Sequence, residues 1–178
     1  MIRQKGQFTM CQFQFRLFYA TLAGSLFLAG CGGSDPAQPS GVASQCALPL
    51  KYADGLNGGY SINTVAQAVP RPFNACTIQQ PLAASVSLCI DHRQMAELSA
   101  QLILPNQTTL DLELPSATQG STCLITGRLL TLPLPVSRLQ AFSGLKGDWT
   151  VRVRDNNSVS NTPMGYLIGW SMQAEGLQ

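Results

Sequence analysis

Apolar and polar residues alternate along much of this chain, most regularly in the segment GDWTVRVRD, residues 147–155. The apolar positions there are Trp149, Val151 and Val153, and the polar ones are Thr150, Arg152 and Arg154. Successive side chains of a β-strand point to opposite faces, so this period of two predicts a strand with one buried and one solvent-facing side. Asp155, which ends the segment, has the parity of the buried side.

Shorter apolar segments, several with the same alternation, follow one another from residue 85 onward. They are SVSLCID (85–91), LSAQLIL (98–104), TLDLEL (109–114), TCLITG (122–127), RLLTLPL (128–134) and GYLIGWSMQAEG (165–176). Short strands separated by turn residues about every 8–12 positions are typical of a β-sandwich or barrel. The pattern therefore predicts an all-β fold. The only helix it favours is a short one near residues 136–142.

The N-terminal segment has a different pattern. Basic residues lie within positions 1–16, and an apolar run of 14 residues, LFYATLAGSLFLAG, follows at 17–30. A bilayer span needs about 20 apolar residues, so residues 1–30 resemble a secretory signal peptide. The run ends in Leu28-Ala29-Gly30-Cys31, which is similar to a bacterial lipobox. The resemblance implies that Cys31 is lipidated and anchors the chain to the membrane.

In that lipoprotein family an Asp directly after the lipidated Cys favours retention in the inner membrane, and here the residue is Gly32. The resemblance therefore implies the outer membrane, with the protein in the cell envelope. Residues 31–45, rich in Gly, Ser and Pro, are expected to form a flexible tether. One folded domain is then expected over residues 46–178.

Composition limits the class of partner. Of eleven basic residues three lie in the leader, which leaves eight basic and nine acidic residues, a net charge of −1, after residue 30. No basic stripe with interleaved aromatic residues occurs, so the sequence gives no indication of nucleic-acid binding.

The cysteines indicate an oxidising compartment. Cys46, Cys76, Cys89 and Cys123 remain once the leader and Cys31 are set aside. Four cysteines in an exported domain predict two disulfides with three possible pairings. The pairing Cys46–Cys76 with Cys89–Cys123 is preferred because it closes residues 46–76 on themselves. A zinc site is the weaker alternative, because the sequence contains no CxxC pair.

Three segments together resemble a known family. They are VSLCIDHRQMAELSAQLILPNQTTLDL (86–112), LKGDWTVRVRDNN (145–157) and GYLIGWSM (165–172), and the most specific positions are Trp149, Asp155, Gly165, Leu167 and Trp170. They are similar to the P domain, or Homo B domain, which follows the catalytic domain of subtilisin-like proprotein convertases and of many secreted bacterial proteases. The resemblance covers about residues 80–178 and implies a jelly-roll β-sandwich of the galactose-binding-like kind.

The chain departs from this family in two places. Ala96-Glu97-Leu98 stands where the family has Gly-Asp-Leu. Residues 46–76 have no clear counterpart, and we interpret them as a cysteine-closed hairpin added to the sandwich.

The candidate catalytic chemistry is sparse. His92 is the only histidine, and no G-x-S-x-G nucleophile motif occurs. Asp91 adjoins His92, but adjacent residues of a strand face opposite sides, so it cannot orient the imidazole. The resemblance also places His92 at a non-catalytic position. We therefore expect a structural histidine and no enzyme, although the family is attached to serine endopeptidases.

The resemblance implies a second possibility, because some P domains bind calcium through acids in strand-end loops. The candidate ligands are Glu97, Asp155, Asn156 and Asn157, with Asp91 behind them. The alternative is that Asp155-Asn156-Asn157 form a turn in which the Asp155 carboxylate accepts backbone hydrogen bonds. Both interpretations stay open at this stage.

These observations favour a non-catalytic, lipid-anchored binding or scaffolding domain. Its partner is expected to be a protein, for which a separately encoded serine endopeptidase is one candidate, or a glycan. An exposed aromatic platform would favour the glycan, and an apolar patch would favour a protein.

Overall fold

The structure is a computed structural model that describes residues 41–53, 59–115, 120–124, 126–142, 144–157 and 165–178. All the described residues belong to one compact unit, Pro39–Gln178. The predicted signal peptide, Cys31 and most of the predicted tether therefore lie outside the described residues.

The regular secondary structure of the described residues consists almost entirely of strands, as the alternation predicted. The strands are β1 (Ala43–Tyr52), β2 (Tyr60–Ile62), β3 (Gln67–Pro72), β4 (Gln80–His92), β5 (Leu98–Ile103), β6 (Thr109–Leu112), β7 (Ser121–Cys123), β8 (Gly127–Pro133), β9 (Asp148–Asp155) and β10 (Gly165–Leu177). A 3-10 turn, η1 (Met95–Glu97), and a short helix, α1 (Val136–Leu139), complete them. The helix expected near 136–142 thus occurs but is only four residues long.

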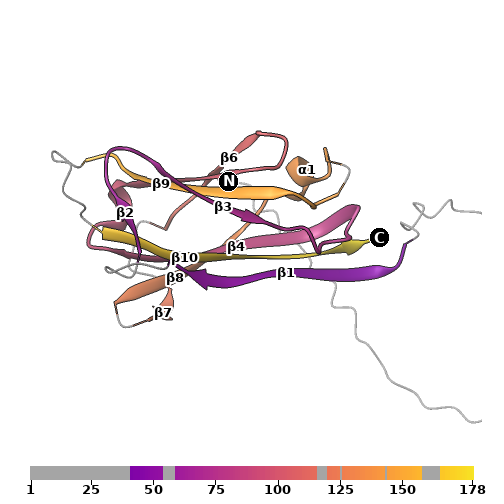
Figure 1. The fold of residues 1–178 in the computed structure, drawn as a ribbon, viewed down its shortest axis with the longest axis horizontal. Helices are drawn as coiled ribbons and strands as arrows, with labels where there is room; N and C mark the ends of the chain where they lie inside the picture. The colour runs from indigo at the N-terminus through magenta and orange to yellow at the C-terminus, as the bar shows by residue number, and fades with distance from the viewer. Residues whose placement is uncertain (1–40, 54–58, 116–119, 125, 143, 158–164) are drawn as a thin grey trace, which may run out of the picture. The chain divides into compact units, whose positions relative to one another are not determined.

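The strands form two antiparallel sheets that lie as separate layers (Figure 1). The first sheet has the order β1-β10-β4-β8-β7, with β2 also paired to β10, and the second has the order β3-β9-β5-β6. The pairs β1–β10, β3–β9, β4–β8 and β5–β6 are nested in the sequence, as in one long hairpin folded over on itself. This nesting is the jelly-roll arrangement, so the predicted all-β jelly-roll sandwich is confirmed.

The core lies between the two sheets. Trp149 and Trp170 are 1% and 0% exposed, and the alternating apolar residues of β4, β9 and β10 pack around them. Each indole also satisfies its polar atom, because Trp149 Nε1 donates to the Leu145 carbonyl at 2.9 Å and Trp170 Nε1 donates to the Val69 carbonyl at 3.1 Å. Both Trp residues are therefore core residues, as their position in the alternation indicated.

The structure of the segment before residue 80 differs from the added hairpin that we expected for residues 46–76. It does not form an added hairpin, because β1 pairs with β10 in the first sheet while β3 pairs with β9 in the second. The segment supplies an edge strand to each layer and so belongs to the jelly roll itself. β1 begins at Ala43, so residues 43–45 of the predicted tether belong to the sheet. The alternation within the segment could not show this, because it does not tell which strand an edge strand pairs with.

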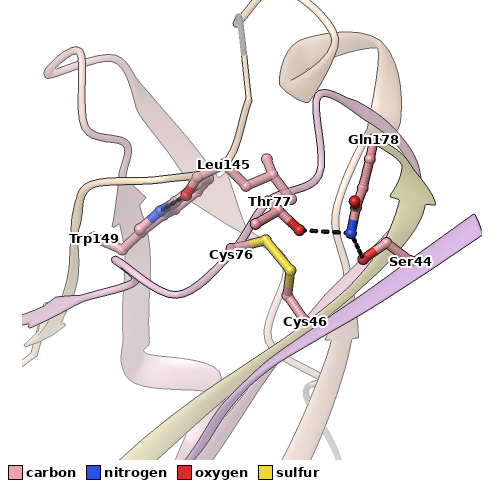
Figure 2. Close-up of a disulfide and its surroundings, with 7 residues drawn as sticks. All are labelled: Ser44, Cys46, Cys76, Thr77, Leu145, Trp149 and Gln178. Carbon is pink, nitrogen blue, oxygen red and sulfur yellow. Dashed lines mark hydrogen bonds between the residues drawn. A yellow bond between two sulfur atoms is a disulfide. The ribbon is translucent and has the colours of Figure 1, made fainter. Parts of the chain in front are cut away.

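Two disulfides are present, with the preferred pairing. Cys46 of β1 is bonded to Cys76, which follows β3, with their Cα atoms 5.3 Å apart. Because β1 and β3 belong to different sheets, this bond joins the two layers. Figure 2 shows it beside Gln178, whose Nε2 donates to the hydroxyls of Ser44 and Thr77.

The second disulfide joins Cys89 of β4 to Cys123 of β7, with their Cα atoms 6.0 Å apart. β8 lies between these strands in the sheet, so the bond crosses over it. A Cβ at Gly127 of β8 would lie 3.0 Å from the Cys89 sulfur and 2.7 Å from the Cys123 carbonyl oxygen. Only glycine leaves room for the disulfide to cross β8. The two bonded cysteines pack with Ile168 in a small second cluster outside the main core.

Candidate functional site

Asp155 is the only buried charged residue among those the structure describes, at 1% exposure. It ends β9, and its backbone N–H donates to the Asn63 carbonyl at 3.0 Å. Its side-chain Oδ1 accepts the backbone N–H of Asn157 at 2.9 Å. The carboxylate therefore closes the strand with a turn, by accepting a backbone hydrogen bond from the loop that follows. The inward orientation expected from its parity is confirmed.

The partner of the second carboxylate oxygen comes from the other sheet. His92 ends β4, its side chain is 2% exposed, and its Nε2 lies 3.4 Å from Asp155 Oδ2. Its Nδ1 accepts the backbone N–H of Gln94 at 3.1 Å. Nδ1 also lies 3.1 Å from the Gln94 carbonyl oxygen, and neither His92 Nε2 nor Asp155 Oδ2 has a hydrogen-bond partner among the described residues. The pair thus joins the two sheets at one end of the sandwich.

Gly165 fixes the histidine from the neighbouring strand. It is the register partner of His92 in the β4–β10 ladder. A Cβ at this position would lie 2.6 Å from His92 Cδ2 and would also overlap the Asp91 carbonyl oxygen. A side chain at Gly165 would therefore displace the imidazole from its position at this strand end.

Glu97, Asn156 and Asn157, the other candidate calcium ligands, lie next to Asp155 and contact one another. Asn156 N–H donates to the Glu97 carbonyl at 2.9 Å, and Asn157 Nδ2 donates to Glu97 Oε1 at 2.8 Å. The side-chain amide of Gln94 also donates to the Glu97 carboxylate. Asn156 Oδ1 accepts from Ser99 Oγ at 3.2 Å and from Arg154 Nε at 3.0 Å. The four candidate calcium ligands are thus neighbours linked by hydrogen bonds.

The arrangement of these four residues does not fit a calcium cage. Calcium needs six to eight oxygen ligands. Asn157 presents its amide nitrogen to Glu97, and the cationic Arg154 occupies the Asn156 oxygen. Asp91 is turned away and accepts from Thr126 Oγ1 at 2.7 Å. Within the described ranges, no group of three His, Cys, Asp or Glu side chains is placed to hold a metal ion. The geometry is that of a hydrogen-bonded turn.

Both ring nitrogens of His92 face protein groups in these contacts. A catalytic histidine needs one nitrogen for an orienting carboxylate and the other for a nucleophile or a water molecule. Here Nε2 faces Asp155, and Nδ1 is used by the backbone of Gln94. None of the hydrogen bonds found for His92 in the described part of the chain involves a hydroxyl or a thiol.

Arg71 is a half-buried cation that the sequence pattern did not single out. From β3 it donates Nη1 to the carbonyls of Pro49 and Trp170, both at 2.6 Å, and its guanidinium carbon lies 5.4 Å from the centre of the Trp170 ring. Burial lowers the pKa of the Arg71 guanidinium, and the nearby Tyr60 partly offsets this. Arg71 therefore links β3 of the second sheet to β1 and β10 of the first.

A glycan platform is not apparent among the described residues. Both Trp side chains are in the core, and Tyr52, at 40% exposure, is the only aromatic residue among the exposed large hydrophobic ones. Glycan-stacking surfaces need exposed aromatic faces, so this part of the chain gives the glycan hypothesis no support. The described residues also contain no helix that is long and apolar enough to span a membrane.

Comparisons with known proteins show the fold. No family model matches the sequence, and no curated protein matches it. Among solved structures, the chain is similar to a chain of the complex of Aeromonas sobria serine protease with its chaperone ORF2, with a TM-score of 0.59 and 16% identity over 79% of this chain. It is also similar to the serine protease of Aeromonas sobria, with a TM-score of 0.56 and 16% identity over 78% of this chain.

In both cases the match spans only 28% of the other chain. The second structure is that of the protease, so the matched region is part of the protease chain. At this level of identity the likeness concerns the fold alone. The chain accordingly has the β-sandwich fold that also occurs as part of a bacterial serine protease.

Proposed function

We propose that this chain is a non-catalytic accessory domain of the P-domain type, anchored to the cell envelope by a lipid on Cys31. Its function is to bind and support a partner protein, for which a serine endopeptidase encoded as a separate chain is the favoured candidate. The observation that carries the proposal is the likeness of the sandwich to one part of a serine protease chain. The Trp149, Asp155, Gly165 and Trp170 positions that resemble a P domain support it from the sequence.

The contacts of His92 and Asp155 support the absence of catalysis. The pair is nearly fully buried and is held by turn and strand backbone. A nucleophile would have to replace one of these contacts. Purified protein is therefore expected to leave unstructured casein intact. Cleavage that disappears in a His92→Ala variant, which still melts cooperatively, would overturn this part of the proposal.

The partner can be identified by purification from membranes. The lipidated, affinity-tagged chain is expected to co-purify from detergent-solubilised envelopes with a protein that reacts with a fluorophosphonate probe for serine hydrolases. A tagged, unrelated lipoprotein of similar size serves as the control. If the captured proteins never include a probe-reactive chain, the protease part of the proposal fails and the scaffolding role is left with a different partner.

A further inference from the structure

A groove opens at the edge of the sandwich between β6 of the second sheet and the end of β8 of the first. It is lined by Asp111, Leu112, Glu113, Leu132, Pro133, Leu134 and Pro135 and has a volume of about 450 Å³. Its apolar floor consists of three leucine residues that also belong to the core, Leu112, Leu132 and Leu134. A partner side chain entering here would contact an apolar surface that is already rigidly packed.

One side of the groove is a free strand edge. Among the described strands, β6 pairs with β5 alone. The Leu104 N–H donates to the Thr108 carbonyl at 2.9 Å, which makes these two residues a hydrogen-bonded pair of the hairpin. Hydrogen-bonded and non-hydrogen-bonded pairs alternate in an antiparallel ladder. Thr109 and Asp111 therefore turn their backbone N–H and C=O groups away from β5, toward the open edge.

The edges formed by β1 and β3 are protected against strand addition by proline and by a register irregularity. β3 carries Pro70 and Pro72, and β1 carries Pro49 at a register irregularity between Leu48 and Lys51. Proline lacks the N–H that a new strand would need, and bulges disturb the register. β6 contains neither feature. The contrast indicates that this edge is available for pairing.

The charge at the groove is acidic. Asp111 and Glu113 are exposed on the β6 side, and no basic residue lines the groove among the described residues. Asp111 accepts a hydrogen bond from the neutral Gln101 amide at 2.9 Å, and on its other side it lines a second pocket together with Arg152 and Arg154. An apolar floor beside two carboxylates is complementary to a segment that combines apolar side chains with lysine or arginine.

We propose that this groove binds an extended peptide segment of a partner protein, with alternating apolar and basic residues, by adding it as a strand to β6. Backbone hydrogen bonds to Thr109 and Asp111 would supply affinity. The leucine floor and the two carboxylates would select the side chains, since alternate residues of an added strand face alternate sides. This inference rests on the proposed protein-binding function, but it does not depend on the partner being a protease.

The test uses a fluorescently labelled synthetic peptide of alternating lysine and valine, with fluorescence anisotropy as the readout. Saturable binding to the wild-type protein is expected, and a peptide of alternating glutamate and valine should not bind. Thr109→Pro removes one outward N–H without touching the β5 ladder. Glu113→Lys reverses one rim charge. Each variant is expected to weaken binding by about tenfold or more.

The matched control is Glu175→Lys, which makes the same charge change on β10, a strand that β4 separates from β8. It should bind the lysine–valine peptide as the wild type does. Melting curves establish that all three variants are folded. The proposal is overturned if the wild type does not bind the peptide, or if folded Thr109→Pro and Glu113→Lys bind it as tightly as Glu175→Lys. Those outcomes leave co-purification of a protease from envelopes unaffected, so the two proposals fail separately.

Discussion

At the scale of single residues, the end of β9 is determined by the polar contacts of one buried carboxylate. Asp155 is on the inward side because strand parity puts it there. A buried carboxylate without partners is costly. One oxygen of Asp155 takes the Asn157 N–H, and the other lies 3.4 Å from His92 Nε2 across the sandwich without forming a hydrogen bond. The residue thus has two structural tasks, which are to close the turn and to join the sheets.

Asp155→Ala is expected to lower the free energy of unfolding by about 1–3 kcal/mol, the usual cost of leaving buried donors without an acceptor. The loss should be the same with and without EGTA, because the contacts are those of a turn. Urea unfolding measures it. Asp148→Ala, at the exposed opposite end of β9, is the control and should change stability by no more than about 0.5 kcal/mol.

The calcium interpretation makes the opposite prediction for the wild type. If Asp155 and Glu97 held calcium, the wild-type melting temperature would fall in EGTA and rise with added calcium, and Asp155→Ala would abolish the difference. A wild-type melting temperature that responds to neither agent would exclude the metal at this site. An Asp155→Ala variant as stable as the wild type would exclude the structural role.

At the scale of elements, the two layers are held together by contacts that cross between edge strands. β3 is joined to the first sheet by Arg71, which reaches two carbonyls and the Trp170 ring. β1 is joined to the segment after β3 by the Cys46–Cys76 bond. Edge strands have one hydrogen-bonded neighbour only, so these cross-links replace the second neighbour that a central strand has.

Arg71→Ala is expected to destabilise the fold by about 2–3 kcal/mol, because hydrogen bonds from a charged donor to two carbonyls are lost. Arg71→Lys should lose less, since an ammonium can still donate but cannot reproduce the planar contact with Trp170. Denaturant unfolding compares the variants. Arg152→Ala, which removes an exposed guanidinium from β9, is the matched control. Equal stability of Arg71→Ala and Arg152→Ala would contradict the role of Arg71.

Each disulfide is expected to stabilise the domain by about 3–4 kcal/mol, since the closed loops of 30 and 34 residues differ little in chain entropy. The double variants Cys46→Ser/Cys76→Ser and Cys89→Ser/Cys123→Ser should therefore lose similar stability in urea. Mass spectrometry of wild-type protein matured in an oxidising compartment should find no free thiols among these four cysteines. Finding all four as thiols would refute the pairing.

At the scale of the whole molecule, attachment to the membrane is expected to depend on residues outside the sandwich. The sequence before residue 41 resembles the leader and lipobox of a bacterial lipoprotein. A single acyl chain holds a protein only marginally at a membrane, whereas two or more hold it firmly. A mature bacterial lipoprotein carries two or three acyl chains. The groove at β6 would then act at the membrane surface, where a partner is confined near it.

Cys31→Ser is expected to give an unprocessed or soluble protein, because the lipid acceptor is lost. Membrane fractionation and intact mass measure both effects. Cys11→Ser, a cysteine replaced within the predicted leader, is the control and should leave processing and membrane attachment unchanged. A Cys31→Ser protein that is still processed before residue 31 and still sediments with membranes would contradict the lipid anchor.

The sequence by itself determined the local features of this protein. The period-two alternation predicted the strands, the inward faces of Trp149, Val151 and Val153, and the inward parity of Asp155. The preferred disulfide pairing also agrees with the structure. The strand faces depend only on neighbours in the chain, and four cysteines allow only three pairings. A pattern of residue types was therefore sufficient to predict these features.

Only the tertiary structure decided what depends on residues that are distant in sequence. It assigned β1 and β3 to different sheets, brought His92 against Asp155, and directed Arg71 onto Pro49 and Trp170. It also left β6 as an open edge beside a groove. The physical reason is that parity tells which face a side chain occupies, but not which strand lies opposite. That choice is made by packing the two apolar faces over the whole sandwich.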